Sequence, residues 1–322
     1  MKGFDSKWQD LPHYILGITR EIWEDRQIHS LDHLYSEDII VRSPGSIVVG
    51  NKGVIAATMA TLAEFPDRQL MGEDVIWSGD DEVGFLSSHR ILSTATHLHE
   101  GMYGPASGMT YRYRIIADCA AKDNVIYDEW LIRDQGAIVR QMGWDPKAYA
   151  VDAIAREGGP EQCVQPLTPD NDQQGAYQSR GNNHQQGQHY ADLLTRIMSA
   201  ELSAVPGEYD RACHLELPGG VTAHGTSAAD QFWMGLRSAF PSAEFKVDHV
   251  IGRDDPGLSP RAAVRWSLTG RHEGWGSFGA PTDAEVHVLG ISHAEFGPYG
   301  LRREYVLFDE TAIWKQIALH TG

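Results

Sequence analysis

The chain has 322 residues, of which 42% are hydrophobic and 22% are charged, and its formal net charge is −17. This length and apolar content predict a globular protein of two domains. So acidic a chain repels nucleic-acid backbones and anionic membrane surfaces, and neither is expected as a partner.

The three cysteines, Cys119, Cys163 and Cys213, lie far apart and form no CxxC pair. This spacing argues against a disulfide framework or a thiolate metal site and favours a reducing compartment. The N-terminus lacks the apolar core of a signal peptide, and no apolar run approaches the roughly 20 residues needed to span a bilayer. We therefore expect a cytoplasmic protein.

Residues 1–150 begin with an amphipathic helix, followed by a short extended segment, "DIIVRSPG", that is closed by Pro-Gly. A second helix, "NKGVIAATMATLAEF", ends at Pro66. Three segments then alternate apolar and polar residues as strands do: "VGFLSSHRILSTATHLH", "MTYRYRIIADCA" and "NVIYDEWLIRD". Helices followed by a meander of strands predict an α+β domain, with an antiparallel sheet covered by helices on one face.

Residues 151–185 are rich in Gln, Asn, Gly and Pro and poor in apolar residues. Such a segment buries too little apolar surface to offset its ordering entropy, which predicts a flexible linker. A functional loop such as a lid is the alternative interpretation.

Residues 186–322 repeat the plan of the first domain. Phe65-Pro66 recurs as Phe240-Pro241, and the same spacing of 175 aligns residues 50–141 with residues 225–316 without a gap. Upstream, the spacing shifts by one residue in either direction. A repeat this long indicates a duplicated domain.

Several short motifs resemble one known family. The first copy contains "FPD", "TATH", "GMYGPASG" and "EWLIRD" leading into "VRQMG", and the second contains "FPS", "TGRH", "GSFGAPTD" and "REYVLFD". In order and spacing they resemble the SnoaL-like polyketide cyclase family of the nuclear-transport-factor-2-like superfamily. The chain departs from the family pattern where "TATH" replaces "GTH", and at Ser242 and Asp283.

The resemblance implies two tandem cone-shaped α+β barrels, in each of which a curved antiparallel sheet wraps around helices and encloses an apolar pocket. It also implies that the copies pack sheet to sheet as an internal pseudo-dimer, in a chain that is either monomeric or a homodimer. The implied function is cofactor-independent acid/base catalysis, such as cyclisation, isomerisation or dehydration of a small hydrophobic carbonyl compound. The alternatives are a non-catalytic binding module for a small hydrophobic ligand, and a structural role for one copy.

Asp118 and His293 occupy matching positions and are the first candidates for proton transfer. Asp118 lies within the apolar strand "RIIADCA", where a charge is costly unless it is paired or functional. Desolvation would raise its pKa toward neutrality, as a general base requires. The alternative is a buried salt bridge to Arg90 or Arg112.

His97 and His272 are shared by the copies at a strand end beside a glycine turn. At the rim of a pocket, such a histidine could donate a hydrogen bond to an enolate oxygen, or it could simply bond the turn backbone. Asp134 could face the pocket beside Trp130, or it could cap the helix that begins at "GAIVRQ".

Trp130, Trp275 and Arg90 are the predicted substrate-binding residues, because aromatic side chains lining a cavity favour a flat hydrophobic ligand. The spacing of His97 and His99 is compatible with metal ligation, but the second copy lacks the second histidine, so no metal is expected. The chain contains no GxGxxG, Walker or GxSxG motif, so we expect no cofactor.

Overall fold

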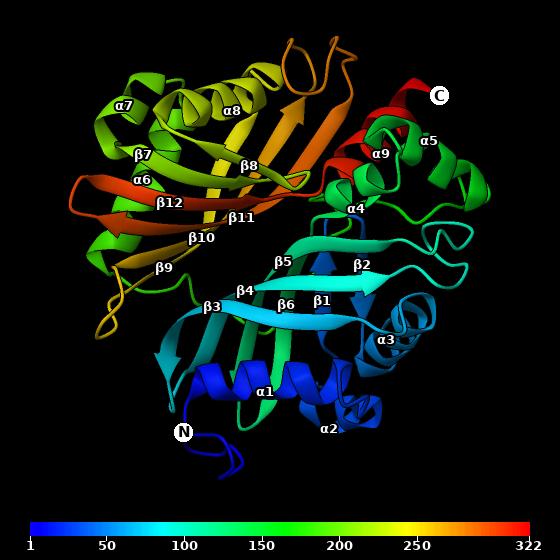
Figure 1. Cartoon of the computed structure of the whole chain (residues 1–322), viewed down its shortest axis with the longest axis vertical. Coiled ribbons are helices and arrows are strands. Elements are labelled where there is room, and N and C mark those ends of the chain that lie inside the picture. Colours follow the sequence, from blue (N-terminus) through cyan, green and yellow to red (C-terminus); the bar gives the residue numbers. More distant parts are fainter.

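The computed structural model describes all residues from 1 to 322 and shows two similar α+β units in succession (Figure 1). Each unit has one six-stranded sheet, in the order β2-β1-β6-β5-β4-β3 or β8-β7-β12-β11-β10-β9. Neighbouring strands are antiparallel, except that β1 lies parallel to β6 and β7 parallel to β12. The matching strand orders confirm the predicted duplication and the α+β class, while each sheet is mixed rather than purely antiparallel.

The first copy begins with α1 at Leu11, where the Asp10 side chain accepts a hydrogen bond from the backbone amide of His13. Its elements are α1 (Leu11–Trp23), the 3₁₀ helix η1 (Ile28–Ser30), α2 (Leu31–Leu34), β1 (Ile40–Ser43), β2 (Ser46–Val49), α3 (Asn51–Glu64), β3 (Gln69–Asp80), β4 (Gly84–Thr96), β5 (Thr110–Lys122), β6 (Val125–Arg133), α4 (Gln135–Gln141) and α5 (Pro146–Arg156). The helix α3 ends one residue before Phe65-Pro66, as the sequence predicted.

The second copy repeats this order from α6 onward. Its elements are α6 (Gln185–Met198), η2 (Leu202–Ala204), α7 (Val205–Glu208), β7 (Tyr209–Leu217), β8 (Val221–His224), α8 (Thr226–Ala239), β9 (Glu244–Arg253), β10 (Arg261–Arg271), β11 (Glu285–Gly297), β12 (Gly300–Leu307) and α9 (Glu310–Thr321). The helix α5 has no counterpart after α9, and it packs against α9 itself. No helix is both long enough and apolar enough to cross a bilayer.

The connection between the copies contacts both of them. The expected domain boundary at residue 150 falls inside α5, and no regular element occurs between Arg156 and Gln185. Within this segment, the Asp172 carboxylate lies 2.7 Å from Arg42 of the first copy. The hydroxyl of Tyr177 lies 2.8 Å from the His249 ring of the second copy. The connecting segment therefore runs along the junction of the two units.

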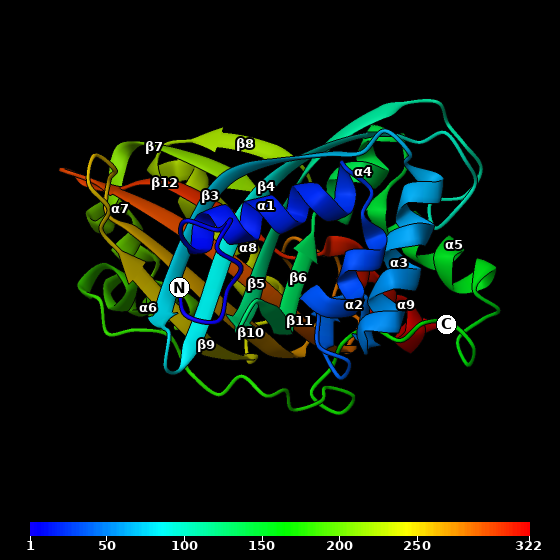
Figure 2. The ribbon, with the colours of Figure 1, turned by 90° about the horizontal axis from the view of Figure 1, so that it is seen from below.

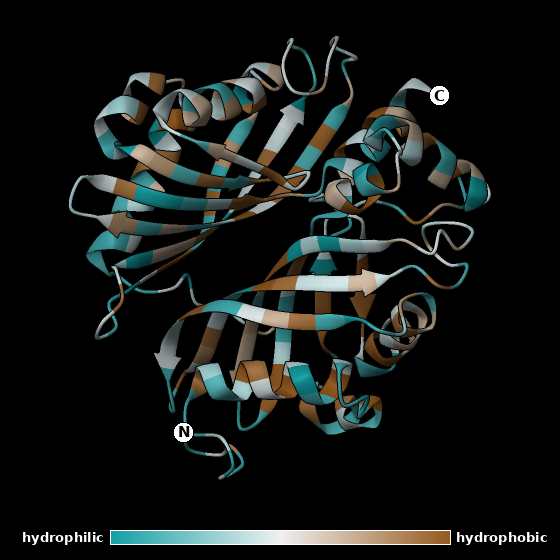
Figure 3. Cartoon of the chain, viewed as in Figure 1, coloured by the Kyte–Doolittle hydropathy of each residue, from teal (hydrophilic) through white to brown (hydrophobic).

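The two sheets face each other across the middle of the molecule (Figures 1 and 2). Helices α1 and α3 lie on the outer side of the first sheet and α6 and α8 on the outer side of the second, while α4, α5 and α9 lie together at one end of the junction. Hydrophobic residues recur along the strands in both units (Figure 3). Side chains from both copies meet between the sheets in two buried apolar groups: Ile116, Ile132, Leu289, Ile291 and Leu307, and Ile76, Leu86, Ala120, Ile251 and Ala263. The chain thus forms the predicted internal pseudo-dimer.

Two arginines at repeat-equivalent positions connect the sheets. Arg90 of the first copy lies over the Tyr305 ring, 3.4 Å from its centroid, and 3.2 Å from His293 Nδ1. Arg265 of the second copy lies over the Trp130 ring at 3.6 Å and pairs with the Asp118 carboxylate at 2.5 Å. Each arginine thus contacts an aromatic residue and a polar residue of the other copy. Such reciprocal contacts are the signature of a two-fold interface.

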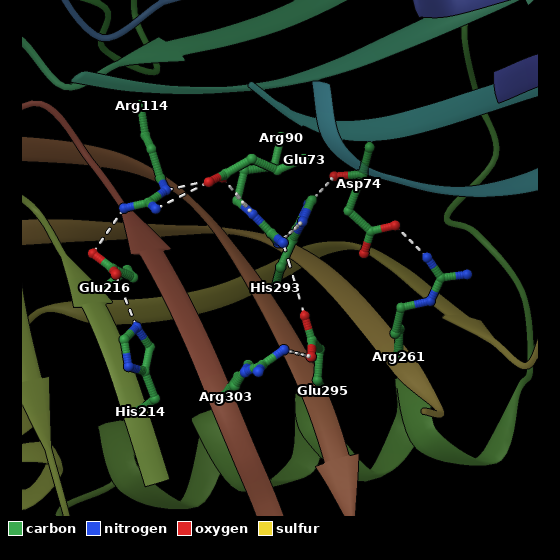
Figure 4. A network of polar contacts seen from close by, with 11 residues as sticks. Glu73, Asp74, Arg90, Arg114, His214, Glu216, Arg261, His293, Glu295 and Arg303 are labelled. Carbon is green, nitrogen blue, oxygen red and sulfur yellow. Dashed lines mark hydrogen bonds and ion pairs between the residues drawn. The ribbon is translucent and has the colours of Figure 1, made fainter. Parts of the chain in front are cut away.

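More ion pairs surround Arg90 (Figure 4). The Glu73 carboxylate accepts hydrogen bonds from Arg90 and from Arg114, at 3.0 and 2.9 Å. Arg114 also reaches Glu216 of the second copy at 2.7 Å, and Asp74 pairs with Arg261. The interface therefore combines apolar contacts with a network of paired charges.

We expect Asp118→Ala to lower the free energy of unfolding by about 3–5 kcal/mol, because the buried Arg265 guanidinium would lose its carboxylate partner. The double variant Asp118→Ala/Arg265→Met should be less destabilised than the single variant, since it also removes the uncompensated charge. Urea titration of the three proteins measures both effects. A single variant as stable as the wild type would show that the pair does not hold the sheets together.

Candidate functional site

A cavity of about 500 Å³ lies inside the first copy, between its sheet and helices α1 and α3. Most of its lining residues are hydrophobic. The buried apolar residues of this copy form two separate clusters, one that includes Ile15 and Ile18 and another that includes Phe65 and Ile138. Both clusters contribute lining residues, so the cavity divides the core of this copy.

The second copy fills the equivalent space with aromatic side chains. Trp233 replaces Thr58, and Trp266 replaces Ile91, at the constant spacing. Both tryptophans are fully buried, and their ring centroids lie 6.3 Å apart. The core of this copy is accordingly one continuous cluster. The duplication has produced one copy with a cavity and one with a filled interior.

Alternate residues of the central strands point into the cavity. Its lining includes Tyr113, Ile115, Ala117 and Cys119 on β5, and Glu129, Leu131 and Arg133 on β6. Because side chains on a strand alternate between its faces, Asp118 and Trp130 point to the opposite face, toward the second copy.

Glu129 is the buried acid on the cavity side of β6. Burial raises its pKa from 4.5 to about 7, and a hydrogen bond from Tyr35 partly opposes this shift. The matching carboxylate, Glu304, accepts hydrogen bonds from two tyrosines, Tyr190 at 2.8 Å and Tyr209 at 2.9 Å.

The first copy retains both tyrosines but arranges them differently. Tyr14, which matches Tyr190, donates its hydroxyl to the backbone carbonyl of Asn124 at 3.1 Å. Glu129 therefore has one tyrosine partner where Glu304 has two. The Glu129 carboxyl thus has fewer hydrogen-bond partners within the protein than the Glu304 carboxyl, and Glu129 also lines the cavity.

His89 is a second titratable residue of the cavity wall, on β4. Burial lowers its pKa to about 4, so the ring is neutral near pH 7. Its Nδ1 lies 3.2 Å from the Ser87 hydroxyl. When Ser87 donates this hydrogen bond, the ring proton is on Nε2. The second copy has Val264 at this position.

Two arginines without an acidic partner also line the cavity. Arg68 is 3% exposed, lies 4.2 Å from the Trp23 ring centroid and contacts Ser93 Oγ at 3.5 Å. Its Nη1 and the Nε of Arg133 are buried without a hydrogen-bond partner. Burial lowers the pKa of Arg68 to about 10. At the matching positions the second copy has Ala243 and Phe308.

His97 lies at the edge of the cavity, behind Glu64. Its Nε2 is 3.1 Å from the Glu64 carboxylate, and its Nδ1 is 3.2 Å from the Ser107 hydroxyl. Glu64 lines the cavity and accepts the backbone amides of Met102 and Tyr103 at 3.0 and 2.9 Å. Through these contacts, Glu64 connects the end of α3 to the loop after β4.

The second copy closes part of the first copy's cavity. Asp309, Thr311 and Lys315, from the start of α9, are among the lining residues. Lys315 pairs with Glu157, just after α5, at 2.6 Å. The cavity is therefore completed only when both copies are present.

The residues predicted from the sequence are distributed over several places. Asp118, His293, Arg90 and Trp130 belong to the interface between the sheets rather than to the cavity. Burial first and Arg90 second hold the pKa of His293 well below its usual value, so that this ring is neutral. For Asp118 the salt-bridge alternative is the observed arrangement, but the partner is Arg265, the repeat equivalent of the expected Arg90.

Asp134 caps α4, the second of the two roles considered for it. Its carboxylate accepts the amide of Ala137 at 3.0 Å and those of Gly219 and Gly220, from the second copy, at 2.9 Å each. Burial raises its pKa to about 7. It therefore serves the helix and the junction of the copies.

His272 and Trp275 also lie away from the cavity. His272 bonds Thr282 at 3.0 Å in its turn, and Ala239 replaces the acid that faces His97 in the first copy. Trp275 is 72% exposed. No cluster of His, Cys, Asp or Glu side chains is arranged to hold a metal ion.

Glu129, His89, Arg68 and Arg133 were not among the site residues predicted from the sequence. A signal for the last three was present in the repeat, because each is polar in the first copy and apolar in the second. A polar residue that the fold can replace with an apolar one is not required for folding. The candidate pairs taken from the sequence are instead polar in both copies, and of these Asp118 and His293 lie in the interface between the sheets.

Residues 13–142 match the family model for the SnoaL-like polyketide cyclases. The first copy is a SnoaL-like domain. Together with the shared strand order, this makes the chain a tandem of two domains with the SnoaL-like α+β fold. No curated protein matches the chain.

Solved structures similar to this chain cover one domain each. IdmH from Streptomyces antibioticus, assigned as a polyketide cyclase, has 21% identity over 42% of this chain and 100% of its own, with a TM-score of 0.36. A protein from Acidithiobacillus ferrooxidans, assigned as a polyketide cyclase, has 20% identity over 40% of this chain and 90% of its own, with a TM-score of 0.35. AclR from Streptomyces galilaeus, assigned as a hydroxylase, has 18% identity over 42% of this chain and 98% of its own, with a TM-score of 0.36.

Burial raises the pKa of Glu304 from 4.5 to about 7. We therefore expect the free energy of unfolding of the chain to fall between about pH 4.5 and pH 7, and we expect Glu304→Gln to reduce that fall. In this range the folded chain keeps a proton on Glu304 that the unfolded chain has released. The resulting stabilisation is complete below the unfolded pKa and is lost as the pH rises through the folded pKa. Urea titrations of both proteins at pH 5, 6 and 8 measure the difference. An equal fall in both would contradict the raised pKa.

Proposed function

We propose that the first SnoaL-like domain is a cofactor-independent acid/base enzyme of the cyclase, isomerase or dehydratase type. Its substrate is a small hydrophobic carbonyl compound bound in the cavity. The observation that carries this proposal is a carboxyl with a pKa of about 7, on Glu129, facing an apolar cavity of about 500 Å³. A group that titrates near the working pH is effective in proton transfer.

In the proposed reaction, the Glu129 carboxylate removes a proton from the carbon next to the substrate carbonyl. The electron pair of the C–H bond forms a carbon–carbon double bond, and the carbonyl π pair moves to the oxygen as an enolate. The proton held by Glu129 then returns to the same or another atom. The net outcome is exchange, isomerisation or ring closure, depending on where the enolate reacts.

His89 is the proposed partner for the enolate oxygen. The ring is neutral, since burial lowers its pKa to about 4. In the tautomer in which Ser87 donates to Nδ1, the ring proton is on Nε2, and the ring is a hydrogen-bond donor there. A preorganised donor at the position where charge develops stabilises the transition state. In the second copy Val264 removes this donor and two tyrosines hold Glu304, which supports a structural role for that copy.

We expect Glu129→Gln to slow exchange of the α-protons of 2-tetralone in D₂O by about 10²- to 10⁴-fold, the usual effect of losing a general base. Proton NMR of the wild type and the variant measures the rate. The matched control is Glu304→Gln, the same change at the equivalent position, which should keep the wild-type rate.

Wild-type exchange in the Glu129→Gln variant, or an equal loss in the Glu304→Gln variant, would contradict this assignment. Ligand binding without any catalysed exchange would favour the alternative, a non-catalytic binding module.

A further inference from the structure

We propose that Arg68 and Arg133 form a carboxylate-binding subsite in the first copy, so that the cavity takes a hydrophobic carboxylic acid as its anion. This inference deepens the proposed function by giving the class of ligand, and it rests on that function only for the reaction that follows binding.

The two guanidinium groups are positioned as an unfilled anion site. Arg68 is packed on the Trp23 ring and touches Ser93, which leaves its Nη1 without a partner. Arg133 lines the same cavity, and its Nε is also unpartnered. Neither makes an ion pair within the chain, whereas the interface arginines Arg90 and Arg265 each have polar partners.

The side chain of Tyr113 is affected by the charges of both Arg68 and Arg133. Its ring is buried on the inner face of β5, and its hydroxyl interacts with Arg68 and Ser93. Burial raises the pKa of Tyr113, but the charges of Arg68 and Arg133 outweigh this effect and lower it overall. The two guanidinium groups therefore create a positive potential at the same end of the cavity.

Folding does not explain these arginines. A buried charge without an ion-pair partner, such as that of Arg68, is destabilising, and the second copy builds the same fold with Ala243 and Phe308 in place of Arg68 and Arg133. A planar guanidinium presents parallel N–H donors that match the two oxygens of a carboxylate. A bound carboxylate would supply the partner that each group lacks.

The surrounding surface favours a carboxylate on a hydrophobic body. Most lining residues are apolar, and a more strongly hydrated dianion such as a phosphate would lose more on entering such a chamber. Arg133 lies four residues from Glu129 on β6, or roughly 13 Å along the strand. A flat acid could thus place its carboxylate at the arginines and its reacting carbon nearer to Glu129.

The test is isothermal titration calorimetry at pH 7.5 with naphthalene-2-carboxylate, naphthalene-2-carboxamide and 2-naphthyl phosphate. The carboxylate should bind about 10- to 100-fold more tightly than the amide, the range expected for hydrogen bonds to a charged group. Arg68→Gln and Arg133→Gln should each weaken carboxylate binding and leave amide binding unchanged. Arg112→Gln is the matched control, because Arg112 is exposed on the same strand as Tyr113 and should bind like the wild type.

Equal binding of the carboxylate and the amide by the wild type would overturn the proposal, and this comparison does not depend on the folding of any variant. Tighter binding of the phosphate would overturn the choice of carboxylate. Glu129→Gln should keep the preference for the carboxylate. If that preference holds while 2-tetralone exchange is absent, the proposed reaction fails and the binding subsite stands.

Discussion

The packing of one sheet against the other is the constraint on which the rest of this protein depends. Arg90 and Arg265 extend across the interface in opposite directions, and each lies on an aromatic ring of the other copy. Their polar partners differ, since Asp118 is an acid and His293 is a neutral ring. The pseudo-two-fold interface therefore keeps its geometry while its two halves use different chemistry.

That interface allows the interiors of the two domains to differ. Trp233 and Trp266 fill the second copy, and its core becomes one continuous apolar cluster. The first copy keeps a cavity lined by Glu129 and buries Arg68 without an ion-pair partner. Such features reduce stability, and a functional site is where proteins commonly retain them.

The fused chain also joins the copies at the cavity itself. The start of α9 contributes Asp309 and Thr311 to the wall, and Lys315 pairs with Glu157 beside it. Asp134 accepts the Gly219 and Gly220 amides from the second copy. The second domain therefore shapes the cavity of the first directly, in addition to covering its sheet.

The sequence by itself determined the duplication, the α+β class, the end of α3 before Pro66 and the family resemblance. These features follow from local patterns, such as helical spacing before Pro66, alternation in the strands and a constant offset of 175 residues. Alternation along β6 also separates one set of residues, with Trp130, from another, with Glu129 and Arg133. Only the tertiary structure decided which set faces the cavity. Both faces of the central strands are buried, one by helices and one by the second sheet, so a two-residue period cannot distinguish them. Asp118 is therefore an interface residue and Glu129 a cavity residue, although both are acids in apolar strands.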